Sequence, residues 1–148
     1  MTVPRITVVT CSFNQGQFLE RAMLSVLDQK YHDLEYIVMD GGSTDNSVEI
    51  IKKYADRLAY WRSHPDDGQS AAIDEGFRMS SGDILCWLNS DDEFAPHALQ
   101  TVADFFQHHP DVSFAYGYCQ LIDKEGNKIK TLKEPFFSPK WQIYVRNC

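Results

Sequence analysis

The segment Ile84-Leu85-Cys86-Trp87-Leu88-Asn89-Ser90-Asp91-Asp92 decides the fold, because an apolar run leads directly into two adjacent carboxylates. A short apolar run that follows Gly82-Asp83 and ends in acidic residues is typical of a buried strand. Open α/β sheets bind ligands at the carboxyl ends of their strands, so Asp91 and Asp92 are predicted to lie at such an edge. Paired carboxylates suit Mg²⁺ or Mn²⁺, which often bind a substrate's phosphates. The alternative is that Asp91 or Asp92 starts the helix predicted after Ala95-Pro96.

The rest of the chain alternates between strand-like and helix-like segments. Predicted strands cover residues 6–11, 36–39, 58–61, 84–88 and 112–121, and predicted helices cover 18–27, 47–54, 71–79 and 96–108. A polar turn at 124–127 is predicted to form a hairpin into residues 128–130. This order predicts an α/β fold, a three-layer α/β/α sandwich with a mostly parallel sheet and right-handed crossovers.

Length and composition indicate one ordinary globular domain over residues 1–148, with 43% hydrophobic and 24% charged residues. The net charge of −7 and the lack of a basic stripe argue against nucleic acid as a partner. No membrane span or signal peptide is visible, so a cytoplasmic location is expected. Four scattered cysteines without a CxxC pair favour reduced thiols over a zinc site or disulfides; they are Cys11, Cys86, Cys119 and Cys148.

Polar side chains follow several of the predicted strands. Because parallel strands deliver their last residues to the same edge, we expect these side chains to converge there, together with the loop 66–70. They are Thr10, Ser12 and Asn14 after the first strand, Asp40 after the second, and Asn89, Asp91 and Asp92 after the fourth. An acidic protein that binds a diphosphate beside two aspartates needs a divalent cation to offset the repulsion.

Some of these residues have simpler interpretations. Asp40 could accept from a base or ribose, or it could form a turn with Gly41-Gly42. The segment Gly68-Gln69-Ser70 could present N–H groups to an anion, or it could simply cap a helix. Asp74 is most simply part of a solvated helix face. The chain lacks both GxGxxG after the first strand and GxxxxGK[ST], which disfavours a nicotinamide-binding enzyme and a P-loop NTPase.

Several ordered segments together resemble family 2 glycosyltransferases of the GT-A fold. The resemblance covers nearly the whole chain and rests on a T-x-x-N turn, an S-v-l-x-Q helix, a D-D-G-S-T-D-like turn and a DxD-like motif. In this sequence these four motifs lie in residues 6–14, 22–29, 35–45 and 88–92, and residues 67–70 with Ala72, Gly76 and 81–83 continue the resemblance between the last two.

The resemblance implies a nucleotide sugar as donor, with UDP the expected nucleotide, and Mn²⁺ or Mg²⁺ as cofactor. Asp40 would face the base, Thr10 and Ser12 would complete the nucleoside site, and Asp91 would bind the metal. The predicted metal ligands are Asp91 and Asp92, and the predicted donor-binding residues are Thr10, Ser12, Asn14, Asp40, Asp67, Gln69 and Asn89. Two positions depart from the family pattern: Asn89 replaces the usual first Asp, and Asp74 replaces an Asn or Arg.

Family 2 enzymes invert the sugar configuration, and a carboxylate deprotonates the acceptor. The resemblance places that base beyond Cys148, so the catalytic residue is unknown, and we expect the chain to be truncated or naturally short, with an incomplete acceptor half. The expected acceptor is a carbohydrate or lipid-linked molecule of cell envelope polysaccharide synthesis, with peripheral association at the inner membrane face through a missing segment. The alternatives are a binding module without catalysis and a nucleotidyltransferase, although residues 12–17 lack the basic residue that the latter needs.

Overall fold

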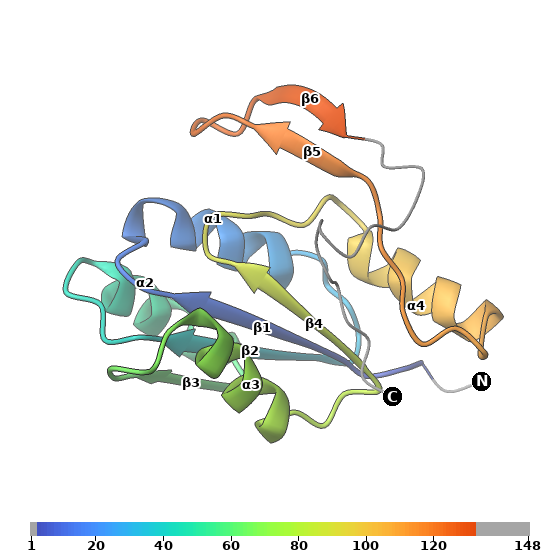
Figure 1. The fold of residues 1–148 in the computed structure, drawn as a ribbon, viewed down its shortest axis with the longest axis horizontal. Coiled ribbons are helices and arrows are strands. Elements are labelled where there is room, and N and C mark those ends of the chain that lie inside the picture. The colour runs from blue at the N-terminus through green and yellow to red at the C-terminus, as the bar shows by residue number, and fades with distance from the viewer. Residues whose placement is uncertain (1–2, 133–148) are drawn as a thin grey trace.

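The structure, a computed structural model, describes residues 3–132. Helices and strands alternate from the first strand to the fourth helix, as the sequence predicts (Figure 1). The elements are β1 (Ile6–Ser12), α1 (Gly16–Leu27), β2 (Leu34–Asp40), α2 (Ser47–Lys53), the 3-10 helix η1 (Ala55–Arg57), β3 (Tyr60–Ser63), α3 (Gln69–Met79), β4 (Ile84–Asn89), α4 (Ala98–His108), β5 (Cys119–Ile122) and β6 (Lys128–Leu132).

Four strands form one parallel sheet in the order β3-β2-β1-β4. The β-branched and apolar residues of β1 are buried along its whole length, which suits an inner strand of a parallel sheet. The register pairs Ser12 with Asp40, Asp40 with Ser63, and Cys11 with Asn89. Because the strands run in the same direction, these terminal residues lie along one edge of the sheet.

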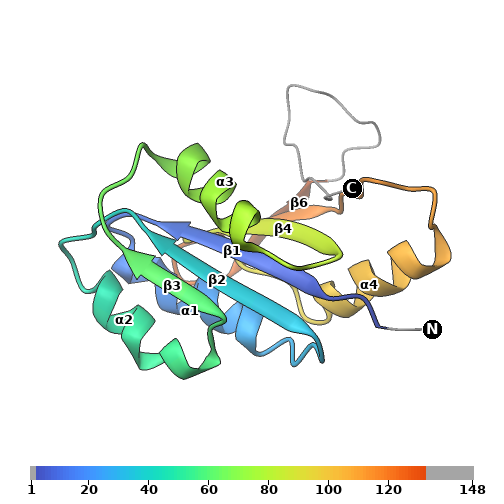
Figure 2. The same cartoon turned by 90° about the horizontal axis from the view of Figure 1, so that it is seen from below.

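Helices cover both faces of the sheet, so the predicted three-layer sandwich is confirmed. Figure 2 shows α3 on one side of the sheet and α1 and α2 on the other. The larger core packs α1, α2 and α4 against Ile6, Val8 and Val38, whereas α3 packs on a smaller core around Val9. Gly76 allows α3 to approach closely, because a Cβ there would lie 2.7 Å from Val9 Cγ1.

The C-terminal part of the described chain differs from the prediction. Residues 112–118 form no strand; instead β5 pairs with β6 in an antiparallel hairpin that is separate from the four-stranded sheet (Figure 1). The predicted polar turn does form this hairpin, with Gly126 at φ 88° and Asp123 accepting from the Asn127 N–H. Local turn chemistry therefore determined the pairing of β5, and the expected addition to the sheet is wrong.

Smaller boundary differences also occur. Strand β3 begins at Tyr60 rather than Leu58, with Leu58 and Ala59 connecting it to η1, and α4 begins at Ala98, two residues after the predicted start at Pro96. The described cysteines Cys11, Cys86 and Cys119 are free thiols, and Cys148 lies outside the described residues.

Candidate functional site

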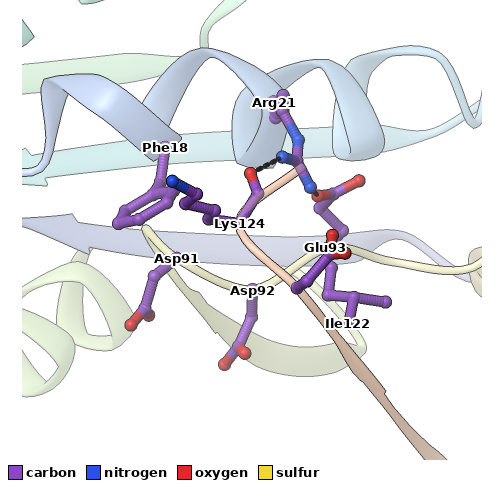
Figure 3. A pocket seen from close by; sticks show the side chains of 8 residues that line it. Phe18, Arg21, Asp91, Asp92, Glu93, Ile122 and Lys124 are labelled. Atoms are coloured by element: carbon purple, nitrogen blue, oxygen red, sulfur yellow. Dashed lines mark hydrogen bonds and ion pairs between the residues drawn. The ribbon is translucent and has the colours of Figure 1, made fainter. Parts of the chain in front are cut away.

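The acidic turn that follows β4 exposes both of its carboxylates. The Asp92 N–H donates to the Asn89 carbonyl at 3.1 Å, which closes the turn, and Ser90 is buried beneath it. Figure 3 shows the Asp91 and Asp92 side chains pointing to the same side, away from Arg21 and Lys124. The helix-start alternative is wrong for both residues, because α4 begins only at Ala98 and its N-cap residue is His97.

A chain of side-chain hydrogen bonds connects this turn to α3. Gln69 Nε2 donates to Asn89 Oδ1 at 2.6 Å, and Asn89 Nδ2 donates to Asp92 Oδ2 at 2.9 Å. Partial burial raises the pKa of Asp92, and the negative charge of Asp91 adds to that effect, although the bond from Asn89 opposes it. The two carboxylates thus form a locally electronegative pair that a cation would stabilise.

Asp40 lies at the end of β2 and is fully buried. Its Oδ2 accepts from the N–H groups of Gly42 and Ser43 and from the Ser63 hydroxyl at 2.6 Å, and its Oδ1 accepts from the Ser43 hydroxyl at 2.5 Å. This is the turn arrangement that the sequence left open as an alternative. The Asp40 carboxylate therefore organises the loop after β2.

The three candidate residues after β1 occupy different environments. The Thr10 side chain is fully buried, and its Oγ1 accepts from the Tyr36 hydroxyl at 3.0 Å, so the structure places it in the core and not at the surface of the edge. Ser12 is 5% exposed, and its hydroxyl has no hydrogen-bond partner among the described residues. Asn14 joins two loops, because its Oδ1 accepts from the Thr44 N–H at 2.8 Å while its own N–H donates to Ser43 Oγ.

The loop before α3 lies at the same edge. Asp67 and Gln69 are exposed. Gly68 is the N-cap residue of α3 with φ 96°, and no side chain caps this helix start. Its N–H instead donates to Asp66 Oδ1 at 2.9 Å, so plain side-chain capping does not describe the segment.

Two residues of this edge were missed in the sequence. Phe13 is 60% exposed, and its Cδ2 lies 3.5 Å from the position that a Cβ on Gly41 would occupy. Asp66 Oδ1 lies 3.4 Å from that same position, so an aromatic face and a carboxylate flank the Gly41 backbone. Arg62, at 6% exposure, donates to the Asp40 carbonyl at 2.9 Å. The signals in the sequence were an aromatic residue, Phe13, in a polar turn and an Arg directly after the apolar run 58–61.

A cavity of about 200 Å³ adjoins the acidic turn between α1 and the β5–β6 hairpin (Figure 3). Arg21 pairs with Glu93 and donates to the Lys124 carbonyl at 2.7 Å. It therefore connects α1 to the acidic turn and to the β5–β6 hairpin, which form the other two walls of the cavity. The residues that line the cavity are Phe18, Arg21, Asp91, Asp92, Glu93, Ile122, Asp123 and Lys124.

Two more residues of α1 and its C-terminal end hold the segment that follows the acidic turn. Ser25 Oγ accepts from the Phe94 N–H at 3.0 Å, and Gln29 Nε2 donates to the Ala95 carbonyl at 3.0 Å. Arg21 and Ser25 are four residues apart and so lie on one side of α1, and Gln29 follows two residues after the end of the helix. This row of side chains fixes the chain immediately after Asp92.

Other acidic side chains have local partners. Asp74 pairs with Arg78 at 2.8 Å on the exposed face of α3, as its simpler interpretation predicted. Asp123 accepts from the Asn127 N–H and from Asn127 Nδ2, which lowers its pKa. Within residues 3–132 no group of three or more His, Cys, Asp or Glu side chains is arranged to hold a metal. A cation at Asp91 and Asp92 would therefore need further ligands.

Comparison with known proteins shows that this chain belongs to one family of transferases. The family model described as Glycosyl transferase family 2 matches residues 7–146. An uncharacterized glycosyltransferase of Nostoc is 33% identical over 146 residues, which cover 90% of this chain and 44% of the relative. A Campylobacter jejuni protein named GalNAc(5)-diNAcBac-PP-undecaprenol beta-1,3-glucosyltransferase is 32% identical over 132 residues, which cover 86% of this chain and 42% of the relative. The chain thus spans less than half the length of these two relatives.

Solved structures show the same fold. Staphylococcus aureus TarS 1-349 in complex with UDP-GlcNAc matches with a TM-score of 0.65 at 21% identity, over 72% of this chain and 32% of TarS. The mannosyltransferase PcManGT from Pyrobaculum calidifontis, in complex with GDP-Man and Mn²⁺, matches with a TM-score of 0.66 at 22% identity, over 76% and 35% of the two chains. No helix within the described part of the chain is long and apolar enough to cross a bilayer.

Proposed function

We propose that this chain, which belongs to glycosyl transferase family 2, binds the nucleotide sugar of an inverting, metal-assisted sugar transfer. The observation that carries the proposal is the convergence of separate segments at one edge of the sheet. The aromatic face of Phe13, the buried Ser12 hydroxyl, the Asp40 turn and the acidic pair Asp91 and Asp92 all follow parallel strands. An edge with an aromatic surface at one place and two carboxylates at another suits a nucleoside joined to a metal-bound diphosphate.

The nucleoside is proposed to lie against Phe13 and the Gly41 backbone. An exposed aromatic ring offers a stacking surface, and Gly41 itself adds no side chain beside it. The Ser12 hydroxyl, which has no partner within residues 3–132, is a hydrogen-bonding group close to this surface. Asp40 and Asn14 would shape the site by ordering the loop 41–44, and Asp67 and Gln69 would approach from the start of α3. UDP is the proposed nucleotide.

The diphosphate is proposed to bind through Mn²⁺ or Mg²⁺ held by Asp91 and Asp92. The donor set fits a hard divalent cation, since two neighbouring carboxylates share one side of an exposed turn and the pKa of Asp92 is raised. When bound, such a cation stabilises the charge of the departing nucleoside diphosphate. Asn89 contributes an amide in place of a charge and orients Asp92 through its Nδ2 hydrogen bond.

The acceptor is proposed to be a carbohydrate or lipid-linked molecule of cell envelope polysaccharide synthesis, and the Campylobacter relative's name includes a lipid-linked saccharide. Inversion needs a carboxylate that removes the acceptor proton. Among the described carboxylates near the acidic turn, Asp91 and Asp92 are assigned to the cation in this proposal, Glu93 pairs with Arg21, and the Asp123 carboxylate is held by Asn127. We therefore propose that the described residues bind the donor and that this chain alone transfers sugar slowly.

The test is titration calorimetry of the purified chain with UDP, UDP-GlcNAc and GDP-mannose in Mn²⁺ and in EDTA. We expect at least one nucleotide to bind with Mn²⁺ and to lose most of its affinity in EDTA. Equal binding in chelator would contradict the metal role, and a lack of binding by every donor would contradict the proposed function. A coupled assay of nucleoside diphosphate release then separates an enzyme from the second candidate, a nucleotide-sugar binding module without catalysis.

A further inference from the structure

We infer that Arg62 is a positioning residue that sets the geometry of the nucleotide-binding edge, an inference that rests on the proposed function. Arg62 is on β3, and its side chain is 5% exposed. Its Nη1 donates to the Asp40 carbonyl at 2.9 Å, to the His64 carbonyl at 3.2 Å and to Asp66 Oδ2 at 3.1 Å. A single guanidinium nitrogen thus joins the end of β2 to the loop that leads into α3.

The other side of the same guanidinium binds α3. Arg62 Nη2 donates to Glu75 Oε2 at 2.6 Å, and Nε donates to Glu75 Oε1 at 3.2 Å, which is a bidentate pair. Glu75, on α3, thereby balances the buried positive charge of Arg62. Because Arg presents its donors in one rigid plane, β2, β3 and α3 are fixed relative to one another.

The effect of this arrangement reaches the edge through Asp66. With one carboxylate oxygen held by Arg62, Asp66 presents the other to the Gly68 N–H at 2.9 Å. This bond sets the start of α3, where Gln69 reaches Asn89. Asp66 also lies beside the Gly41 backbone opposite Phe13, which is the proposed nucleoside surface.

The structure thus assigns to Arg62 the pre-organisation of the nucleoside surface and not contact with the ligand. A surface that must be ordered during binding loses affinity compared with one that is already ordered. Loss of the Arg62 contacts should therefore weaken binding of the nucleoside part. Binding of a metal–pyrophosphate at Asp91 and Asp92 depends on the turn after β4, which Arg62 does not contact and reaches only indirectly through Gln69 and Asn89, so it should change much less than UDP binding.

The experiment compares Arg62→Lys, which keeps the charge but not the planar set of donors, and Glu75→Gln, which keeps the shape but removes the balancing charge. The matched control is Asp74→Asn, which breaks an exposed ion pair on the same helix. For each purified protein, calorimetry measures the Kd of UDP with Mn²⁺ and the Kd of Mn²⁺-pyrophosphate, and thermal unfolding gives the Tm.

We expect UDP affinity to fall about tenfold in Arg62→Lys and about threefold in Glu75→Gln, while Mn²⁺-pyrophosphate affinity stays within about twofold and Asp74→Asn matches the wild type. Equal losses for both ligands would show a general structural role and overturn the inference, as would unchanged UDP affinity in both variants. If Arg62→Lys does not fold, Glu75→Gln decides the matter. Failure of the wild type to bind either ligand would refute the proposed function itself. That outcome differs from failure of the Arg62 inference, in which the wild type binds both ligands.

Discussion

The side chain of Gln69 donates a 2.6 Å hydrogen bond to Asn89, and this bond joins the first residue of α3 to the last residue of β4. The side-chain amide of Asn89 in turn donates a hydrogen bond to the Asp92 carboxylate. These two consecutive hydrogen bonds require an amide at position 89, because an Asp there would have no N–H to donate to Asp92. The departure from the usual first Asp of the motif thus removes a charge but adds a bond that orients the second carboxylate.

Replacement of Asp91 by Asn should abolish cation-dependent nucleotide binding and leave the fold intact. Asp91 is exposed, so removal of its charge has little consequence for the packed core. Calorimetry with UDP in Mn²⁺ and in EDTA should give similar, weak affinities for the variant. The control is Asp56→Asn, an exposed carboxylate on η1, which should retain the wild-type difference. Retained cation dependence in Asp91→Asn would remove Asp91 from the metal site.

The raised pKa of Asp92 predicts two opposite pH effects. Since the folded pKa lies above the ordinary value of 3.8, the folded state binds more protons than the unfolded state across that window. The contribution of Asp92 to stability is therefore present below the window and is lost as pH rises through the folded pKa. Cation binding should instead strengthen as pH rises, because the carboxylate must be charged to bind.

Denaturant titrations of the cation-free protein across pH 3–6 test the first effect, and Mn²⁺ titrations across the same range test the second. Asp92→Asn should lose this pH dependence in both measurements. Identical pH profiles for the variant and the wild type would mean that Asp92 has an ordinary environment.

The side chains that extend from α1 and its C-terminal end should stabilise the acidic turn after β4. Gln29→Ala removes the hydrogen bonds to the Ala95 carbonyl and from the Leu99 N–H, so the segment after Asp92 loses one anchor. We expect Mn²⁺-dependent UDP affinity to fall about threefold to tenfold while binding in EDTA is unchanged. Gln17→Ala, on the exposed side of α1, is the matched control. Wild-type affinity in Gln29→Ala would show that the turn holds its shape without this anchor.

The order of elements and the edge that carries the site could be predicted from the sequence, because both follow from local patterns. Apolar runs fixed the strands, and the parallel arrangement then brought Asp40 and the acidic turn to one edge. The role of Arg62 could not be predicted, because its partners lie on three separate elements. The hairpin of β5 with β6 was predicted, but its separation from the four-stranded sheet was not, since a strand pattern alone does not say whether a further neighbour continues the sheet.

The direction of the Thr10 side chain also could not be predicted from the sequence, and a substitution of Thr10 tests the environment that the structure gives it. The strand end was predicted correctly, but the alternation of side chains along β1 turns the Thr10 hydroxyl into the core, toward Tyr36. Thr10→Val should leave the Tyr36 hydroxyl buried without that partner and lower the free energy of unfolding by about 1–3 kcal/mol. UDP affinity should remain unchanged at temperatures where the variant is folded. A stable variant with weakened UDP binding would instead return Thr10 to the binding site.

Asp123 is a carboxylate in the hairpin wall of the cavity beside the acidic turn, and so it is the first candidate for an overlooked base. Its geometry argues against that role, because hydrogen bonds from Asn127 lower its pKa and a carboxylate that holds its charge so readily is a weak base. We expect Asp123→Asn to change any acceptor-dependent turnover of the chain by less than about threefold, whereas loss of a general base typically costs about 10²–10⁴-fold.

The measurement is nucleoside diphosphate release with and without a panel of acceptors, and Asp111→Asn serves as the exposed control. In the wild type we expect slow release that does not depend on the acceptor, which is donor hydrolysis. Robust acceptor-dependent turnover that disappears in Asp123→Asn alone would place the base in the hairpin and contradict this assignment.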